Sequence, residues 1–168
     1  MKGRNIQQHI RKAGLDGWLL YDFQGGNPIA RRLLGGHDLM LTRRWFWWVP
    51  ARGEGVALVH TIEAGQFKGF EGKVRTYVSW QDLRRQLGAI LDGCDRIAME
   101  YCPGGVIPHV SRVDAGTLEL VRECGVQVVS SADLIQWVEA RWKATGLRLH
   151  QDAARLVTQA KDDAFAYI

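Results

Sequence analysis

The sequence predicts an α/β fold built around a mixed β-sheet. Over residues 79–142, short apolar stretches alternate with helical patterns, which is typical of parallel neighbouring strands. The apolar stretches RWFWWV (44–49) and GVALVH (55–60) are joined by PARGE, which predicts a hairpin and therefore an antiparallel component. The chain has 168 residues, of which 46% are hydrophobic and 24% charged, so it suits one globular domain, or one domain and a fragment of another.

The first third predicts a helix, a strand and a short second helix. Apolar residues recur at helical spacing over 4–13, and Gly14 is a natural stop. The stretch GWLLYD (17–22) has the apolar composition of a strand. In the glycine-rich loop that follows, Asn27 has the side chain of a helix cap and Pro28 suits the first helical position.

The second half predicts strands and helices in alternation. Apolar runs bounded by turn residues mark the strands, and the helices combine a capping residue with an apolar face. The expected strands are 73–78, 95–100 and 126–130, and the expected helices are 79–91, 114–124 and 130–142.

The C-terminal part has a different character. After Gly146, residues 148–168 carry an apolar stripe at helical spacing and no stop signal. We therefore expect one domain over 1–143, and over 144–168 a linker and the first helix of a further domain.

Composition narrows the class of protein. The three cysteines form no CxxC pair, and no stretch has the length of a signal peptide or of the ~20-residue apolar segment that spans a bilayer. These features favour a cytoplasmic protein without a membrane partner. The net charge of +4 is concentrated in the first 44 residues, but without a dense basic run we interpret it as a solvated surface and predict no nucleic-acid partner.

Candidate catalytic groups are few. Asp22 and Glu100 end two predicted strands, where carboxylates could hold metal ions, although solvent-exposed strand ends are the simpler interpretation. His37–Asp38 is a loop pair, and neighbours in sequence rarely ligate one metal together. Cys102 lies near His109, but no cysteine-protease signature surrounds it.

The run RRWFWWVP (43–50) is the most unusual segment. In a strand, Trp45 and Trp47 share one face and Phe46 and Trp48 the other, so both faces are apolar. A strand covered on both sides explains this pattern, and a core role is favoured. A face left bare would instead mark a docking surface, and Arg43, Arg44, Trp45, Trp47 and Trp48 are the candidates for it.

The opening segment resembles the start of the creatinase/prolidase/aminopeptidase P family of pita-bread metallohydrolases. The residues that carry the resemblance are GLDG (14–17) at the entry to a strand, Asn27 in the loop, and Leu34-Gly35 at the end of the next segment. The family's Tyr and Thr in that last motif are replaced here by RRLLG (31–35). At the other end, ARLVTQAKDDAFAYI (154–168) is similar to the helix with which the family's catalytic domain begins.

The resemblance implies a three-layer α/β/α domain with a mixed, mostly parallel sheet and ribonuclease H-like topology. It implies that this chain is the non-catalytic N-terminal domain of an Xaa-Pro aminopeptidase-like or dipeptidase-like metallohydrolase. A C-terminal catalytic domain would hold two divalent metal ions (Mn, Co or Zn). The fragment itself would contain neither metal ligands nor catalytic residues. The N-terminal domain would contribute to a homo-oligomer, such as a dimer, and would border the route by which the peptide substrate reaches the catalytic site. Asn27 is one candidate for a residue at this access route or interface.

Two other functions stay open at this point. One is a self-contained ribonuclease H-like enzyme that uses carboxylates and metal ions. The other is a module that binds a peptide or a nucleic acid through the aromatic run and its arginines.

Overall fold

The computed structural model describes residues 2–35 and 40–167. The chain divides into two compact units, residues 1–135 and 136–168, and each is described by itself. The first unit contains the sheet and its helices, and the second contains the long C-terminal helix.

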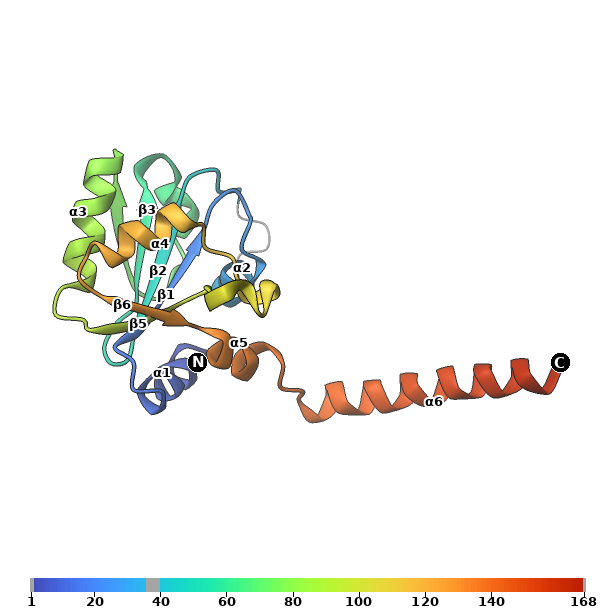
Figure 1. The fold of residues 1–168 in the computed structure, drawn as a ribbon. Coiled ribbons are helices and arrows are strands. Elements are labelled where there is room, and N and C mark those ends of the chain that lie inside the picture. Colours follow the sequence, from blue (N-terminus) through green and yellow to red (C-terminus); the bar gives the residue numbers. More distant parts are fainter. Residues whose placement is uncertain (1, 36–39, 168) are drawn as a thin grey trace. The chain divides into compact units, whose positions relative to one another are not determined.

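A six-stranded mixed sheet forms the centre of the first unit (Figure 1). Its strands run in the spatial order β4-β3-β2-β1-β5-β6. The pairs β1–β2 and β2–β3 are antiparallel, whereas β3–β4, β1–β5 and β5–β6 are parallel, so the predicted mixed and mostly parallel sheet is confirmed. The strands are β1 (Gly17–Asp22), β2 (Trp45–Pro50), β3 (Val56–His60), β4 (Lys73–Tyr77), β5 (Arg96–Met99) and β6 (Gln127–Ser130).

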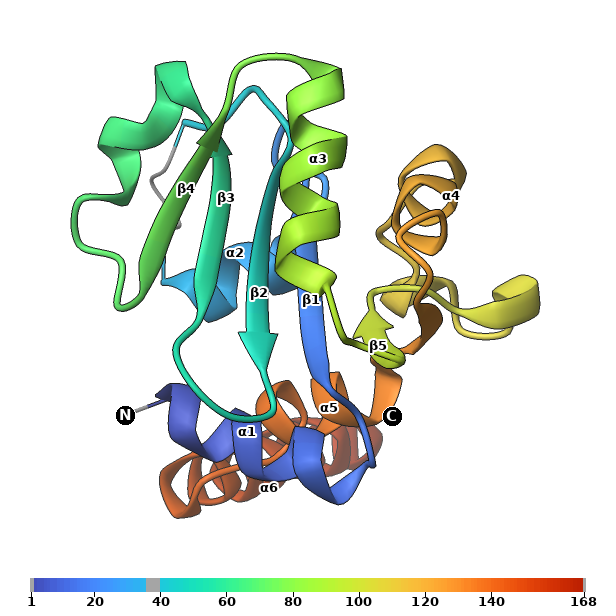
Figure 2. The same cartoon turned by 90° about the vertical axis from the view of Figure 1, so that its left-hand side faces the viewer.

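Helices lie on both sides of this sheet. Figure 2 shows α3 in front of the strands and α2 behind them. The helix α1 contacts β1 and β2, and α4 contacts α3 and β6. The helices are α1 (Lys2–Lys12), α2 (Pro28–Leu34), α3 (Trp80–Leu91), α4 (Ala115–Arg122), α5 (Ala132–Glu139) and α6 (Ala144–Tyr167).

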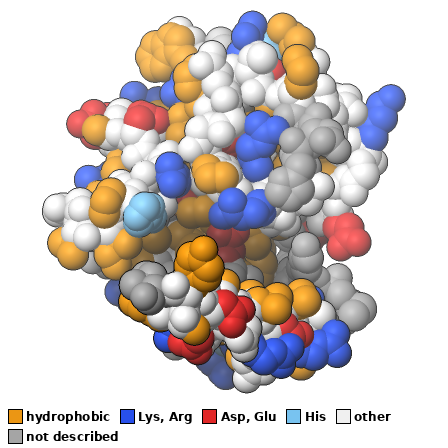
Figure 3. Space-filling model, turned by 90° about the vertical axis from the view of Figure 1, so that its right-hand side faces the viewer, with side chains coloured by type: hydrophobic (Ala, Val, Ile, Leu, Met, Phe, Trp, Pro, Cys, Tyr) orange, Lys and Arg blue, Asp and Glu red, His pale blue; other side chains and the backbone are white. Residues whose placement is uncertain are grey.

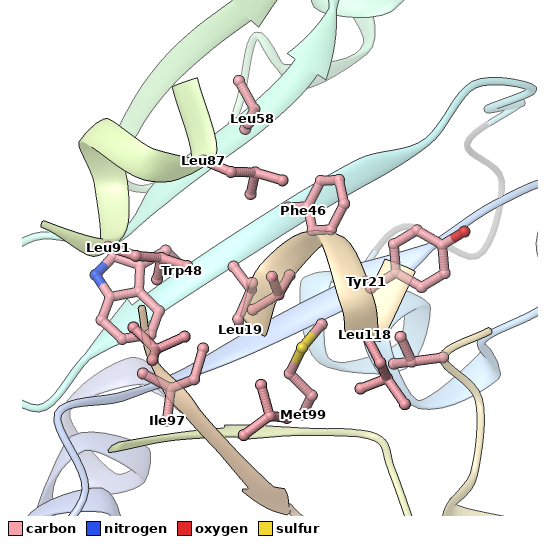
Figure 4. Packing of buried hydrophobic residues seen from close by; sticks show 14 of the residues in the cluster. Leu19, Tyr21, Phe46, Trp48, Leu58, Leu87, Leu91, Ile97, Met99 and Leu118 are labelled. Atoms are coloured by element: carbon pink, nitrogen blue, oxygen red, sulfur yellow. The ribbon is translucent and has the colours of Figure 1, made fainter. Parts of the chain in front are cut away.

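A cluster of buried apolar side chains lies between the sheet and the pair α3–α4 (Figure 4). Phe46 and Trp48 of β2 point into it, together with Leu19 and Tyr21 of β1. Leu87 of α3 covers them from the helix side. Burial on this scale is the main favourable contribution to the stability of such a domain.

Gly17 is required by the approach of Trp48. A Cβ atom at Gly17 would lie 2.1 Å from the Trp48 ring, so the ring would have to move. We expect Gly17→Ala to lower the free energy of unfolding by about 1–3 kcal/mol in urea denaturation. Gly88→Ala in α3 is the matched control, because nothing lies within 4 Å of its Cβ position and the helix gains about 1 kcal/mol. Equal effects of the two substitutions would contradict this packing.

The structure differs from the sequence prediction in several elements, of which two are described here. The predicted helix over 130–142 ends at Glu139. The short η1 helix (Thr61–Phe67) was not predicted, and long-range contacts hold it: Glu63 accepts hydrogen bonds from the backbone N–H groups of Thr42 (2.7 Å) and Arg43 (3.2 Å). A local pattern cannot reveal such partners.

The helix α6 leaves its apolar stripe uncovered. Leu149, Leu156 and Val157 are 60–70% exposed, and Tyr167 at its end is 95% exposed. Figure 3 looks along this helix from its C-terminal end and shows apolar side chains beside charged ones. Across the described ranges 2–35 and 40–167, no helix has both the length and the apolar character needed to cross a bilayer.

Candidate functional site

Two buried carboxylates lie at the carboxyl ends of the adjacent parallel strands β1 and β5. Asp22 is the last residue of β1 and Glu100 directly follows β5. Both side chains are 0% exposed. The interpretation of these residues as solvent-exposed strand ends is therefore wrong, because indole rings and the loop 23–27 supply their hydrogen-bond partners.

Three N–H groups donate to Glu100. The indole Nε1 of Trp18 donates to Oε1 at 2.5 Å. The side-chain amide of Asn27 donates to Oε2 at 2.7 Å, and the backbone N–H of Tyr21 donates to the same oxygen at 3.2 Å. The carboxylate thus links strand β1, the following loop and strand β5.

Asp22 binds the loop in a similar way. Its oxygens accept the backbone N–H groups of Asn27 (2.7 Å) and Gly25 (3.2 Å), and the indole Nε1 of Trp45 (3.1 Å). These bonds hold the backbone in a tight turn in which Gln24 has a φ of 53°. A left-handed glutamine is uncommon, so the carboxylate bonds stabilise a turn that the sequence alone would not favour.

Asn27 connects the two carboxylates. Its amide nitrogen donates to the Tyr21 carbonyl (2.6 Å) as well as to Glu100, and its oxygen accepts the N–H groups of Ile29 (3.1 Å) and Ala30 (3.2 Å) at the start of α2. The predicted helix cap is therefore present. Because Asn27 is only 1% exposed, its assignment to an access or interface surface is corrected: it stabilises the interior.

Burial governs the charge state of Glu100. Removal from water raises the pKa of this carboxyl to about 7, and the hydrogen bonds from Trp18, Tyr21 and Asn27 offset part of the effect. The two influences oppose each other because the donors stabilise the ionised form, whereas a low-dielectric surrounding disfavours it.

This shift predicts a pH-dependent stability. The Glu100 carboxyl titrates near 4.5 in the unfolded chain and near 7 in the folded one, so between these values the folded chain binds more protons. We expect the free energy of unfolding to fall by on the order of 3 kcal/mol between about pH 5 and about pH 8. Urea denaturation across this range measures it, and Glu100→Gln should flatten the slope. A free energy of unfolding that rises with pH over the whole window would contradict the assignment.

The aromatic run is mostly core. Trp45 is 0% and Trp48 is 6% exposed, so neither is available at a surface. Trp48 packs on the α3–α4 side, and Trp45 lies on the opposite face near the Phe67 ring, at 6.0 Å between ring centroids. Their assignment as interface candidates is corrected because the chain itself covers both rings.

The other candidates of this run remain at least partly accessible. Arg43 is exposed, and Arg44 and Trp47 are half-buried. The Trp47 ring packs edge-on against Phe70 at 5.8 Å. Any docking role of the run therefore depends on these three residues.

A second polar cluster lies on the α3–α4 side of the sheet and is centred on Asp114. The Tyr21 hydroxyl donates to Asp114 Oδ2 at 2.9 Å, and Asp114 also accepts the N–H and hydroxyl of Thr117 at 2.8 and 2.7 Å. Burial raises the pKa of Tyr21 to about 12. Burial also acts to raise the pKa of Asp114, but the Thr117 and Tyr21 hydrogen bonds hold it below the ordinary value. The cluster fixes the start of α4.

The other residues considered as candidate sites, Cys102 with His109 and the pair His37–Asp38, form no such network among the described residues. Cys102 is buried, and its sulfur accepts the Ile107 N–H at 3.1 Å. Such a contact stabilises a loop. In the same loop, the backbone carbonyl of His109 accepts a hydrogen bond from Arg112 Nε at 3.1 Å. The pair His37–Asp38 lies outside the described residues. Within the described part of the chain, no three His, Cys, Asp or Glu side chains are placed to hold a metal ion.

The fold defines a class of domain. The six-stranded sheet with helices on both sides is that of creatinase/prolidase N-terminal domains, which confirms the fold implied by the sequence resemblance. No protein-family model and no curated protein sequence matches the chain.

Solved structures with this fold come from several organisms. The creatinase/prolidase N-terminal domain of an X-Pro dipeptidase from Streptococcus pyogenes has a TM-score of 0.61 at 16% identity, covering 82% of this chain and 98% of its own. Dipeptidase PepE from Mycobacterium ulcerans has a TM-score of 0.65 at 18% identity, covering 88% of this chain and 38% of its own. The prolidase from Pyrococcus horikoshii OT3 has a TM-score of 0.60 at 14% identity, covering 99% of this chain.

These matches differ in extent. The chain spans only 43% of the length of the Pyrococcus prolidase, but nearly the whole of the isolated Streptococcus domain. It therefore corresponds to one part of the longer peptidases.

Proposed function

We propose that this chain is the non-catalytic N-terminal domain of an Xaa-Pro dipeptidase-like or aminopeptidase-like metallohydrolase. The observation that carries the proposal is the near-complete match to isolated N-terminal domains of X-Pro dipeptidases, at 98% and 100% coverage of those domains. The identities of 16% and 14% support a shared fold, and the assignment of the peptidase role is our inference from it.

The catalytic domain is the proposed partner of α6. The apolar stripe of this helix is exposed along its length, and burying such a stripe is favourable by roughly 25 cal/mol per Å². We assign residues 1–143 to the N-terminal domain, and residues 144–168 to a linker and the first helix of the catalytic domain. The two divalent metal ions would belong to that domain, which would supply their ligands and the hydrolytic chemistry.

In a homo-oligomer, the first unit would help to shape access for a peptide substrate. Arg43, Arg44 and Trp47 are the accessible members of the aromatic run and are our candidates for this surface. Arginine and tryptophan are enriched among residues that dominate binding energy, which supports the choice.

A ribonuclease H-like activity is the second candidate, because Asp22 and Glu100 end neighbouring parallel strands. The geometry disfavours it, since both carboxylates are fully buried and already accept three N–H groups each. A metal-binding site needs carboxylate oxygens that are free to coordinate. Calorimetric titration with Mg²⁺ or Mn²⁺ would reveal a site if this alternative were correct.

Hydrogen exchange of α6 tests the docking proposal. The helix amides should exchange rapidly in the isolated chain and slowly in the protein encoded by the complete reading frame. Leu156→Asp should restore rapid exchange in the longer protein, whereas Arg155→Asp, off the apolar stripe, should not. Equal exchange rates in the isolated chain and the longer protein would exclude docking of this stripe.

A further inference from the structure

The strand β4 forms one edge of the sheet (Figure 2). Among the strands in the described part of the chain, β3 alone pairs with it, and the two run in parallel. The side chains of residues 73–76 are all exposed. The strand is therefore accessible to solvent along most of its length.

Two residues of β4 direct their backbone polar groups away from the sheet. The Lys73 N–H donates to the Gly55 carbonyl at 2.9 Å, and alternate residues of a parallel strand bond to the same neighbour. Lys73 and Arg75 therefore bond towards β3, whereas the N–H and C=O groups of Val74 and Thr76 point outwards. An edge of this kind is a template for one further strand.

The two faces of β4 differ in chemical character. Lys73 and Arg75 lie on one face, and Val74 and Thr76 lie on the other. Val74 is 40% exposed and continues the cross-strand row that begins at Trp47 of β2. A strand added to this edge would meet cations on one face and an apolar surface on the other.

The positive charge of β4 is accessible to a binding partner. Lys73 lies 3.8 Å from Glu54, but the two side chains are 68% and 55% exposed, so this ion pair is weak and can be displaced. Glu71, two positions before Lys73, is also exposed. The net positive charge of the strand is therefore centred on Arg75.

A second copy of the chain would be a poor partner for this edge. If two β4 strands paired antiparallel about Arg75, Val74 of one copy would exchange hydrogen bonds with Thr76 of the other. The two Arg75 side chains would then lie directly opposite each other, and like charges in this position are destabilising. Opposite charges stabilise the same pairing, so the edge favours a strand with a carboxylate at this position.

We propose that β4 binds an extended segment of another protein in which acidic and apolar side chains alternate. Backbone hydrogen bonds to Val74 and Thr76 hold the segment as an additional strand of the sheet. Its carboxylates lie beside Lys73 and Arg75, and its apolar side chains extend the surface at Val74. This contact is independent of the peptidase assignment, because it uses only the edge of the sheet.

Hydrogen exchange with a designed peptide tests the proposal. The probe is a capped peptide of about eight residues that alternates glutamate with valine or threonine, and the control peptide has lysine in place of glutamate. At low ionic strength, saturation of the 168-residue chain with the probe should slow exchange of the Val74 and Thr76 amides about ten-fold or more. The lysine peptide should bind at least about five-fold more weakly, because it brings like charges together.

Val74→Pro isolates the contribution of the backbone. Proline lacks the outward N–H and is tolerated on an edge strand where that group faces solvent, so the ladder to β3 is preserved. The variant should bind the glutamate peptide about ten-fold more weakly. The matched control Val74→Thr retains the N–H and should bind like the wild type.

Arg75→Glu tests the charge independently of position 74. This exposed substitution should reverse the preference between the two peptides. Val74 and Thr76 amides that gain no protection from the glutamate peptide, or equal affinity of the wild type for both peptides, would overturn the proposal. A concentration-dependent dimer of the chain alone that protects these two amides would assign the edge to a second copy and would overturn it as well.

Discussion

Trp45→Ala should lower the free energy of unfolding by about 3–5 kcal/mol. The ring is fully buried, packs near Phe67 and donates to the buried Asp22, so its removal leaves a large cavity and a carboxylate with one donor fewer. Urea denaturation at neutral pH measures the change.

Trp47→Ala is the control for this prediction. Trp47 is the neighbour of Trp45 on the same strand face but is half-buried. Its replacement should therefore lower the free energy of unfolding by about 2 kcal/mol or less. A Trp45→Ala variant as stable as Trp47→Ala would show that the run is not core. The same pair distinguishes folding from assembly, because only Trp47 is accessible enough for its loss to weaken a contact between proteins.

Asn27→Asp should destabilise the domain by about 3–5 kcal/mol at neutral pH. Aspartate preserves the oxygen that caps α2, but it removes the donors to Glu100 and to the Tyr21 carbonyl. It also adds a carboxylate to an interior that already contains Asp22 and Glu100. Thermal and urea unfolding of the purified variant would show the loss.

Asp114→Asn provides the matched comparison for Asn27→Asp. It exchanges the same two side-chain types at the cap of α4, where the residue is exposed, and should cost about 1 kcal/mol or less. If Asn27→Asp were equally mild, the buried network would contribute little to stability. The difference between the two variants should shrink as the pH is lowered, because the added carboxyl group becomes neutral.

Local patterns were sufficient to predict much of the fold. The apolar run of β1, the Asn27-Pro28 start of α2 and the hairpin of β2 and β3 all follow from neighbouring residues. The alternation of the aromatic run also predicted correctly that Trp45 and Trp48 lie on opposite faces of the sheet, because the period of two is a property of any strand.

The site depends on contacts that no local pattern contains. Trp18 and Glu100 are 82 residues apart, and Trp45 is 23 residues from Asp22. A carboxylate at the end of a strand is normally expected to face solvent. The burial of Asp22 and Glu100 could be predicted only with knowledge of the loop and the indole rings that cover them. The only sequence signal was the presence of tryptophans on β1 and β2, whose indole N–H groups need acceptors when buried.

The peptidase assignment is tested most directly by activity measurements on the isolated chain and on the protein encoded by the complete reading frame. With Mn²⁺ or Co²⁺ and Xaa-Pro dipeptides or longer Xaa-Pro peptides, the isolated chain should give no turnover, and the longer protein should give turnover that a chelator abolishes. Hydrolysis by the pure isolated chain would contradict the account, as would a folded, metal-loaded longer protein that hydrolyses no Xaa-Pro bond.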